Sequence, residues 1–305
     1  MGITRNMSAG YYFLTLDGIT NGCGVLKSCS PEMHTADVIK IPDASGMLYR
    51  KTPGNLQMTK VTATMGAEGV GKEFAQWWTD SLQAKCRYVG GKVDFGDYSL
   101  KIVQTFEFRE ALLTSLKFPD CDSASKDAGM VEFEYTPEYC RLIKGNGSLD
   151  KGTINAAQKQ WQPSNFKLSV DKVGADACAK VFKVAGMKMT QKTATDYHGP
   201  NREGELLGAA VDFDDVTVTI AMVNAEPWYK WHEDMVILGK TDESSAESGG
   251  AVEYLSTDLQ KTLMTVNFHG MGIFKIAQDK QDKDSKKGMT VTATCYIQGM
   301  DIVKA

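Results

Sequence analysis

Apolar and polar residues alternate along much of this chain in short stretches. In segment 61–65, Val61, Ala63 and Met65 alternate with threonines, and segments 216–220 and 264–268 have the same pattern. A period of two residues is typical of a β-strand with one buried face and one polar face. The pattern therefore predicts a mainly β protein.

Two segments instead have the spacing of an amphipathic helix. Each places several apolar residues on one face, ending at Leu82 in the first segment and at Met235 and Leu238 in the second. Pro227 stands where proline suits a first helical turn. We expect one flanking α-helix in each half of the chain. The helix residues expected in the two domain cores are Phe74, Trp77, Trp78, Trp228 and Trp231.

The order of these elements occurs twice along the chain. The matched segments are 12–24 with 166–178, 60–65 with 215–220, 74–80 with 228–234, and 106–108 with 266–268, at offsets of 154, 155, 154 and 160 residues. The closing strands, near residues 130 and 290, can be matched at two offsets. An offset of 159 aligns a shared Gly-Met pair, and an offset of 160 keeps the side chains on the same face of the strand. We adopt 160, because a slip of one residue would turn the core face toward water.

A tandem repeat of two domains follows from these matches. We expect a first domain over residues 1–145, with a long arm near 30–54. A linker rich in Gly, Ser, Asn and Gln covers residues 146–163, and a second, diverged domain covers 164–305. Each domain is expected to be a β-sandwich or half-barrel with its flanking helix.

Composition narrows the class of protein. A length of 305 residues, with 42% hydrophobic and 24% charged residues, is typical of two globular domains. A net charge of −4 argues against nucleic-acid binding, which needs clustered Lys and Arg. We see no secretory signal and no apolar run long enough to span a membrane, and expect a soluble protein made in a cytoplasm. The seven cysteines show no metal-ligand spacing, and we expect small buried thiols, with disulfides formed after release as the alternative.

One glycine-rich segment, GAEGVGKE at Gly66–Glu73, has the spacing of a phosphate-binding loop. Gly66, Gly71 and Lys72 fit, but Glu73 occupies the position at which Ser or Thr would hold Mg²⁺. We therefore expect a plain turn, and keep a nucleotide-binding enzyme that uses Gly66–Lys72 as an alternative. The four histidines are far apart in the sequence, so we predict no enzyme, no metal site and no cofactor.

Four phrases follow one another in the first half: YFLTLDG from Tyr12, YRKTPG at Tyr49–Gly54, VTATMG at Val61–Gly66, and FAQWW from Phe74. In this order they resemble the tube proteins of contractile phage tails and of related contractile injection systems. The resemblance spans most of residues 10–143. The second half shares only the skeleton FKLSVD, VTVTI and WYKWHED, and its arm lacks the Lys-Thr-Pro-Gly phrase.

The resemblance implies a structural tail tube protein. In such a tube six domains form a ring around a channel, rings stack through the arm, and a contractile sheath lies outside. The implied partners are further copies of the chain, the sheath protein, and baseplate and tail terminator proteins, with DNA or effectors passing without specific binding. The implied location is the virion tail or an injection-system particle, assembled in the cytoplasm of a host bacterium. The inter-ring arm candidates are Tyr49, Arg50, Lys51, Pro53 and Gly54.

Polar strand faces are the candidates for the channel wall, with ordinary solvent-facing positions as the alternative. The candidate residues are Thr62, Thr64, Glu107, Glu132, Glu134, Thr217 and Thr219.

Two domains in one chain allow three assemblies: a trimer with pseudo-sixfold symmetry, as in an adaptor or baseplate hub; a hexamer of double height; or a hexamer with the second domain outside. We favour a hexamer of the main tube. A carbohydrate-binding β-sandwich is a further alternative, based on Tyr49 and Trp161 as exposed aromatic residues.

Overall fold

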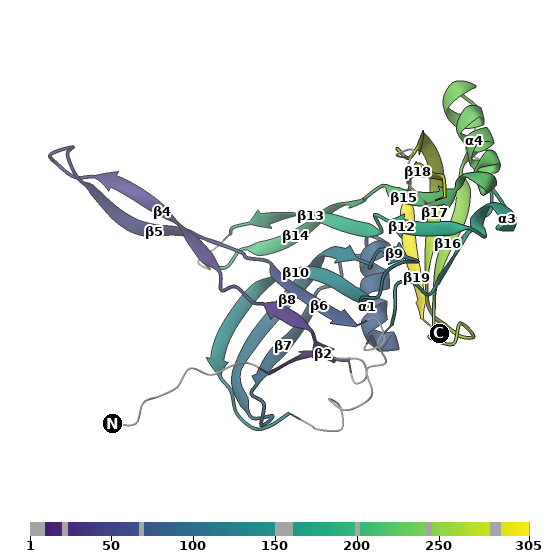
Figure 1. Ribbon diagram of the computed structural model, residues 1–305. Helices are drawn as coiled ribbons and strands as arrows, with labels where there is room; N and C mark the ends of the chain where they lie inside the picture. The colour runs from purple at the N-terminus through teal and green to yellow at the C-terminus, as the bar shows by residue number, and fades with distance from the viewer. Residues whose placement is uncertain are drawn as a thin grey trace.

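The computed structural model describes residues 10–19, 24–66, 70–149, 161–198, 202–241, 246–280 and 288–304. Its strands form two large antiparallel sheets and one separate two-stranded ribbon, with a helix beside each sheet (Figure 1). The mainly β fold class with a flanking helix in each half is confirmed. Within the described ranges, no helix is long and apolar enough to span a bilayer.

The first sheet follows the alternating segments of the first half. Its strands, in spatial order, are β2 (Val25–Leu26), β1 (Tyr11–Leu16), β7 (Val89–Gly96), β8 (Ile102–Lys117), β10 (Met130–Lys144), β6 (Val61–Gly66) and β3 (Ser28–Ser30). The second sheet contains β11 (Phe166–Val170), β16 (Ser248–Leu255), β17 (Thr262–Gln278), β18 (Thr290–Tyr296), β15 (Val216–Ala221), β12 (Val181–Ala185) and β9 (Cys121–Asp122), and β19 (Gly299–Lys304) pairs with β17.

The two sheets have the same strand order. The path β1-β7-β8-β10-β6-β3 corresponds to β11-β16-β17-β18-β15-β12. The register also corresponds: Phe133 pairs with Leu116, and 160 residues later Ala293 pairs with Ile276. Both ladders contain a β-bulge two residues before these positions, at Thr114 of β8 and at Phe274 of β17. Because a bulge fixes the register locally, the shared bulge makes the correspondence specific to single residues.

The closing strands face the core in phase. The buried residues are Val131, Phe133 and Tyr135 in β10, and Val291, Ala293 and Cys295 in β18. These six positions match at an offset of 160, so the offset chosen by side-chain face describes the structure. The offset of 159 would have aligned buried with outward-facing positions.

Two hairpins interrupt the otherwise matched sheets. The first consists of β4 (Thr35–Pro42) and β5 (Tyr49–Gln57), which pair only with each other among the described residues. The second consists of β13 (Lys188–Asp196) and β14 (Glu205–Phe213), and β13 also pairs with the end of β8. The second hairpin therefore belongs to the first sheet, although it comes from the second half of the chain.

One continuous ladder joins the two sheets. Segment Ser115–Lys117 pairs with Lys188–Thr190, the Phe118 N–H donates to the Met187 carbonyl (3.0 Å), and β9 pairs with β12 in the same register. Strands therefore cross the predicted boundary between the halves in both directions. The division at residues 145 and 164 remains a prediction, and residues 150–160 of the predicted linker lie outside the described ranges.

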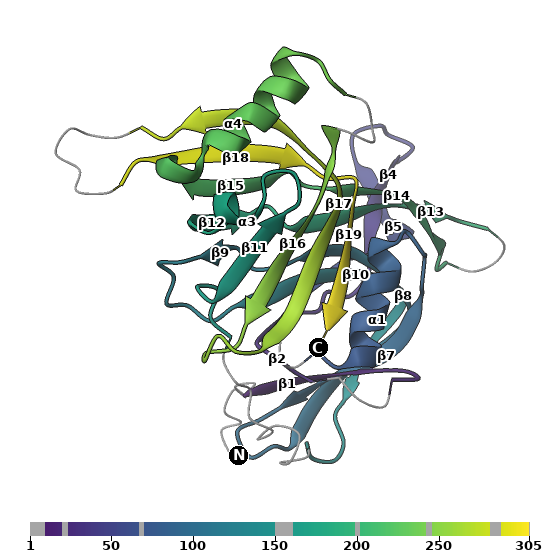
Figure 2. The ribbon, with the colours of Figure 1, turned by 90° about the vertical axis from the view of Figure 1, so that its right-hand side faces the viewer.

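The two longest helices bury their phenylalanine and tryptophan residues. Helix α1 (Lys72–Leu82) lies beside β8 and β19, and α4 (Glu226–His232) packs against β17 (Figure 2). Phe74, Trp77, Trp78, Trp228 and Trp231 are all buried. Three short elements, α3 (Ala175–Cys178), η2 (Met222–Asn224) and the π-turn η3 (Glu233–Ile237), are also helical.

The predicted helix face of the second half is wrong at its last residue. Met235 is buried as expected, but Leu238 is 56% exposed. The α-helix ends at His232 and continues as the π-turn η3. A π-turn takes more residues per turn than an α-helix, so the face drifts and Leu238 points to solvent.

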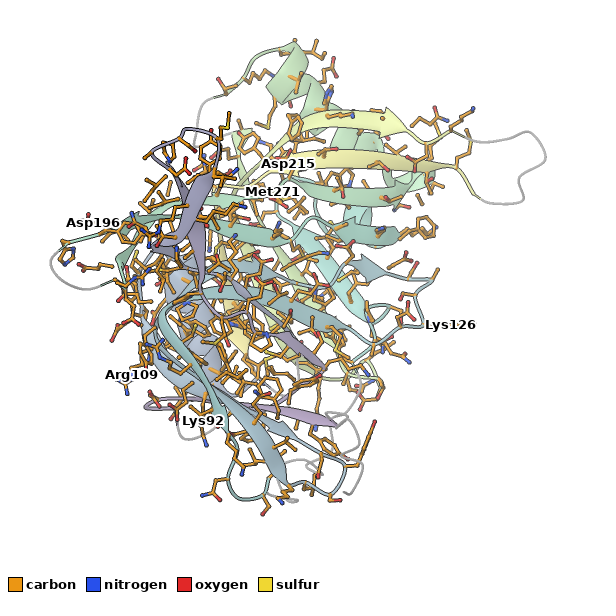
Figure 3. All side chains as sticks on the ribbon, turned by 90° about the vertical axis from the view of Figure 1, so that its left-hand side faces the viewer. Lys92, Arg109, Lys126, Asp196, Asp215 and Met271 are labelled. Atoms are coloured by element: carbon orange, nitrogen blue, oxygen red, sulfur yellow. The ribbon has the colours of Figure 1, made fainter. Side chains whose placement is uncertain are left out.

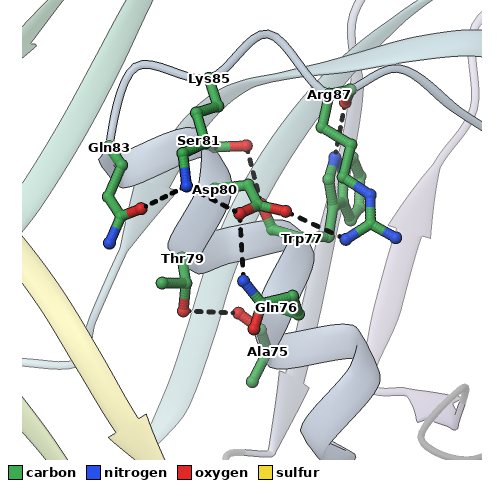
Figure 4. Close-up of polar contacts among 9 residues, drawn as sticks. All are labelled: Ala75, Gln76, Trp77, Thr79, Asp80, Ser81, Gln83, Lys85 and Arg87. Atoms are coloured by element: carbon green, nitrogen blue, oxygen red, sulfur yellow. Dashed lines mark hydrogen bonds and ion pairs between the residues drawn. The ribbon is translucent and has the colours of Figure 1, made fainter.

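Polar contacts of Asp80 fix the end of α1. The Asp80 carboxylate accepts hydrogen bonds from Arg87 (3.1 Å) and Gln76 (3.0 Å), and lies 3.7 Å from the Lys85 ammonium (Figure 4). The Trp77 indole N–H donates to the Arg87 carbonyl (3.2 Å). These contacts tie the segment after the helix to its last turn and hold the Trp77 ring in the core.

Candidate assembly surfaces

The β4–β5 ribbon, called the arm below, projects from the body of the molecule (Figure 1). Every residue of β4 is exposed, and the tip exposes Met47 (86%), Leu48 (69%) and Tyr49 (60%). A single two-stranded hairpin cannot bury a face of its own. Three consecutive apolar residues therefore face solvent at the tip. Arg50, Lys51, Pro53 and Gly54, the other predicted arm residues, lie on β5.

The tip of the arm is an ordered turn. The Asp43 carboxylate accepts hydrogen bonds from the Ser45 hydroxyl (2.6 Å) and the Ser45 N–H (3.1 Å), and the hydroxyl bond lowers the pKa of Asp43. Gly46 has a φ of 70°, in the left-handed region that glycine adopts without strain. The turn holds the apolar tip residues in a defined position although they cover no core.

The base of the arm is held by the second half of the chain. The Arg202 guanidinium donates to the Gly54 carbonyl (2.8 Å), and the Tyr197 hydroxyl donates to the Leu56 carbonyl. His34 Nε2 lies 3.0 Å from the Glu138 carbonyl oxygen, and the Thr59 N–H donates to His34 Nδ1. The base of the arm is therefore fixed to the body while its outer part extends into solvent.

The channel candidates lie on the outward faces of the two sheets. In the first sheet Thr62 pairs with Glu134, Thr64 with Glu132, and Glu107 with Arg141. In the second sheet Thr217 and Thr219 pair with Thr294 and Thr292. The joining ladder brings these outward faces into one connected sheet surface. Whether this surface lines a channel remains a prediction.

Two of the three glutamates among the channel candidates, Glu132 and Glu134, are accompanied by lysines. Lys60 Nζ lies 3.6 Å from Glu134, and Lys117 Nζ lies 3.7 Å from Glu132. All four side chains are more than a third exposed, so these ion pairs add little stability. Their effect is on charge, because the pairs leave the surface close to neutral at these positions.

The β13–β14 hairpin is docked on the first sheet. The Tyr88 hydroxyl donates to the Leu206 carbonyl (2.6 Å), and the Glu138 carboxylate accepts the Leu206 N–H (2.7 Å). Gly208 approaches the sheet so closely that a Cβ atom there would lie 2.4 Å from Cys86 Sγ. Asp196, at the end of β13, and Arg109, on β8, lie along the same margin of the molecule as the arm (Figure 3).

A cleft of about 520 Å³ lies between the docked hairpin and strands β8 and β10. Its wall includes Glu138, whose pKa is raised by burial and by the neighbouring Glu110 and Glu205 carboxylates, against the Leu206 N–H that lowers it. Glu203 on the hairpin side forms an ion pair with Arg141 (3.0 Å). These polar contacts fasten the hairpin across the cleft.

The described residues of the glycine-rich segment do not line the cleft. β6 ends at Gly66, Lys72 is the exposed first residue of α1, and residues 67–69 of the glycine-rich segment lie outside the described ranges. The cleft is formed by other residues. In the described chain, no group of His, Cys, Asp and Glu side chains is arranged to hold a metal ion. The six cysteines described are free thiols, of which Cys86 is exposed.

Trp161 was expected to be exposed, and this expectation is wrong. Its side chain is 3% exposed and its ring meets the Tyr254 ring edge to face, with centroids 4.1 Å apart. Gly129 lies against this ring, where a Cβ atom would be 2.6 Å from the indole. A buried tryptophan cannot stack on a sugar, so Tyr49 alone remains of the two aromatic residues proposed for carbohydrate binding.

Sequence reasoning missed the docked hairpin and the ladder that joins the sheets. The available signal was the offset of 155 residues, which holds from β5 and β14 into β6 and β15. It predicts equivalent hairpins in the two halves, but does not say which sheet each hairpin covers.

Comparison with known proteins finds similarity in solved structures alone. No family model and no curated protein matches the sequence. A protein of the PVC sheath–tube complex, an extracellular contractile injection system, is 18% identical over 47% of this chain and 94% of its own, with a TM-score of 0.40. The PVC sheath/tube terminator is 19% identical over 47% of this chain and 99% of its own, with a TM-score of 0.40. The tube-terminating cap of the anti-feeding prophage is 14% identical over 48% of this chain and 95% of its own, also with a TM-score of 0.40. The chain is thus similar to proteins of contractile injection systems over about half of its length.

Proposed function

We propose that this chain is a structural, non-enzymatic protein that forms rings around a channel, and that the rings stack into the tube of a contractile tail or injection apparatus. The observation that carries the proposal is the arm. It is ordered at its turn, fixed at its base, and exposes Met47, Leu48 and Tyr49 at its tip. A ribbon built in this way needs an apolar surface outside its own chain, and the neighbouring ring provides one.

The outward faces of the sheets form the channel wall in this proposal. The four candidate threonines are uncharged, and Glu132 and Glu134 are accompanied by lysines. A wall of this kind has no basic stripe that would retain a polyanion. DNA or effector proteins would pass along it without specific binding.

A position in the tube of a tail implies further partner proteins. A sheath protein would surround the tube, and baseplate and terminator proteins would bind the two ends. The particle would be assembled in a bacterial cytoplasm as a virion tail or an injection-system particle. An adaptor ring or baseplate hub is the second candidate role, since a duplicated chain suits a ring with fewer subunits.

Shortening the arm tests the proposal. Replacing residues 39–52 with an Asn-Gly turn keeps the pairing of Val38 with Pro53 and removes the apolar tip. We expect a folded protein that forms single rings but no stacks in negative-stain electron microscopy. The control is Tyr98→Ser, which removes an aromatic residue that is 73% exposed at a turn away from the arm. Tubes of normal length from the shortened arm would contradict the proposal.

A further inference from the structure

Equivalent edges of the two sheets differ in exposure. At the end of β8, Ser115 is 8% exposed and Leu116 is fully buried. Their equivalents in β17, Lys275 and Ile276, are exposed and partly exposed, and the bulge residue Phe274 is 41% exposed. The strands have the same register and the same bulge, so the difference comes from what covers them.

The end of β8 is covered by a strand from the second half of the chain. Segment Lys188–Thr190 pairs with Ser115–Lys117 on the edge opposite β10. On β17 the corresponding edge begins after Met271, where the pairing with β16 stops. In the described ranges no strand pairs with this edge. One sheet therefore has its edge occupied, and the other presents the equivalent edge to solvent.

The helices show the same difference. Ala75 and Leu82 of α1 are buried, and α1 packs against β19, where Ile302 is 7% exposed. The equivalents of these helix residues in α4, Tyr229 and Val236, are 38% and 45% exposed. The equivalent of Ile302 on β10 is Leu142, which is 42% exposed. One face of α4 and the end of β10 at Leu142 are thus left exposed.

The hairpins supply the missing strand. Their pairings contain a bulge at Ala36–Val38 and another at Gln191–Thr193, at the constant offset of 155 residues. By this offset the segment equivalent to Lys188–Thr190 is Met33–Thr35, at the base of the arm. The docked hairpin is therefore a template for the contact that the arm lacks.

We infer that neighbouring copies of this chain bind each other through the same kind of contact that joins the two halves within one chain. Residues Glu32–Thr35 of one copy pair antiparallel with Lys275–Gln278 of a second copy, with Thr35 opposite Lys275. The α4 helix of the second copy covers Leu142 of the first. The inference specifies the lateral contact of the ring and rests on the proposed function to that extent.

The backbone of the open edge is oriented for this pairing. The Asp279 N–H donates to the Thr290 carbonyl (3.0 Å) on β18. Successive N–H groups of a strand point to opposite sides, so the Gln278 N–H points to the open edge. Its equivalent, the Phe118 N–H, donates to Met187 in the joining ladder.

The contact is heterologous, because a surface of the second half meets a surface of the first. Repeating it gives a ring in which the two halves alternate, and closure covers the open β17 edge of every copy. A ring of six domains then contains three chains. A hexamer with one tier of first halves would need the β8 edge for lateral contacts, but that edge is occupied by β13 of the same chain.

A disulfide tests the register. Met33 and Ala277 would face each other as a pair without hydrogen bonds, with Cα atoms about 4.5 Å apart, which a disulfide can bridge. We would combine Met33→Cys and Ala277→Cys in a Cys86→Ser background and oxidise the assembled protein. We expect covalent multimers on non-reducing gels, with the 33–277 link identified by mass spectrometry. The control pair is Met47→Cys with Ala277→Cys, which places one thiol at the arm tip and should remain unlinked.

A proline tests the edge independently. Gln278→Pro removes the N–H that points to the open edge, and we expect monomers in mass photometry with an unchanged unfolding midpoint. Ala277→Pro, which removes an N–H that points to β18, should lower the unfolding midpoint as well. Rings in electron microscopy without the 33–277 link, or rings from Gln278→Pro, would overturn the inference and leave the proposed function standing. Absence of any assembly by the unmodified chain would overturn both.

Discussion

The β4–β5 and β13–β14 hairpins have the same pairing pattern but differ in how much of their surface is buried. Both have a bulge at the same place, and both lie between matched strands of their halves. In β13, Met189 is buried and Gln191 is 3% exposed, whereas every residue of β4 is exposed. The docked hairpin lies on a neighbouring sheet of its own chain, and in the assembly we infer, the sheet next to the arm belongs to another copy.

The exposed residues of the arm fit this interpretation. β4 contains Val38, Ile39 and Ile41, each at least 49% exposed. The corresponding outer part of β13 has mostly threonine, lysine and alanine. Among the described residues, the outer part of the docked hairpin exposes fewer large apolar side chains than the arm does. Removing contacts from each hairpin should therefore affect different properties of the protein.

The largest expected effect on folding is at the docked hairpin. Met189 has no exposed surface and pairs with Leu116 and Phe213. Met189→Ala should lower the free energy of unfolding by about 2–5 kcal/mol, because it leaves a cavity between the hairpin and the sheet. Urea denaturation followed by tryptophan fluorescence measures the change.

The matched variant lies in the free arm. Ile41→Ala should change the free energy of unfolding by less than about 0.5 kcal/mol, because Ile41 is 49% exposed. Equal losses in the two variants would show that the arm is packed in the monomer, and would remove the distinction between the hairpins.

A smaller effect is expected from the hydroxyl that fastens the docked hairpin. Tyr88→Phe removes the bond to the Leu206 carbonyl (2.6 Å) and the one accepted from the Gly208 N–H (3.4 Å). The loss should be about 0.5–1.5 kcal/mol, with faster amide exchange confined to β14. Tyr49→Phe in the exposed arm is the control and should leave both quantities unchanged. Uniform acceleration of exchange across the first sheet would contradict a local role for Tyr88.

The sequence predicts the parts of this fold that repeat with a simple period. Alternation placed Val61, Ala63 and Met65 on the buried face of a strand, and the helical spacing identified the buried tryptophans of α1 and α4. The arm near residues 30–54 was predicted as a segment, and it forms the β4–β5 ribbon. These features depend on contacts within one element or between matched elements, which a single sequence records.

The rest depends on contacts between distant segments. The pairing of β13 with β8 joins residues more than 70 positions apart, and nothing in KMTQKT predicts that it covers the first sheet rather than the second. Trp161 was assigned to a polar linker because its neighbours in sequence are polar, yet it packs on Tyr254. Leu238 was placed on a helix face that a π-turn displaces. Burial of this kind is decided by tertiary contacts, which override local pattern.

The smallest expected effect distinguishes the bases of the two hairpins by pH. His34 occupies the position of Met189, and its pKa is lowered from 6.5 by burial and by Arg141, against the Glu138 carbonyl and Glu203, which raise it. The unfolded chain therefore takes up the proton first, so the contribution of neutral His34 is complete above pH 6.5 and declines as the pH falls through that value. His34→Gln should lack this decline in urea midpoints measured between about pH 7.5 and pH 5. Glu138, with its raised pKa, has the opposite slope in both proteins, so the difference between them isolates His34. Parallel midpoints across this range would show that the arm base does not depend on the neutral imidazole.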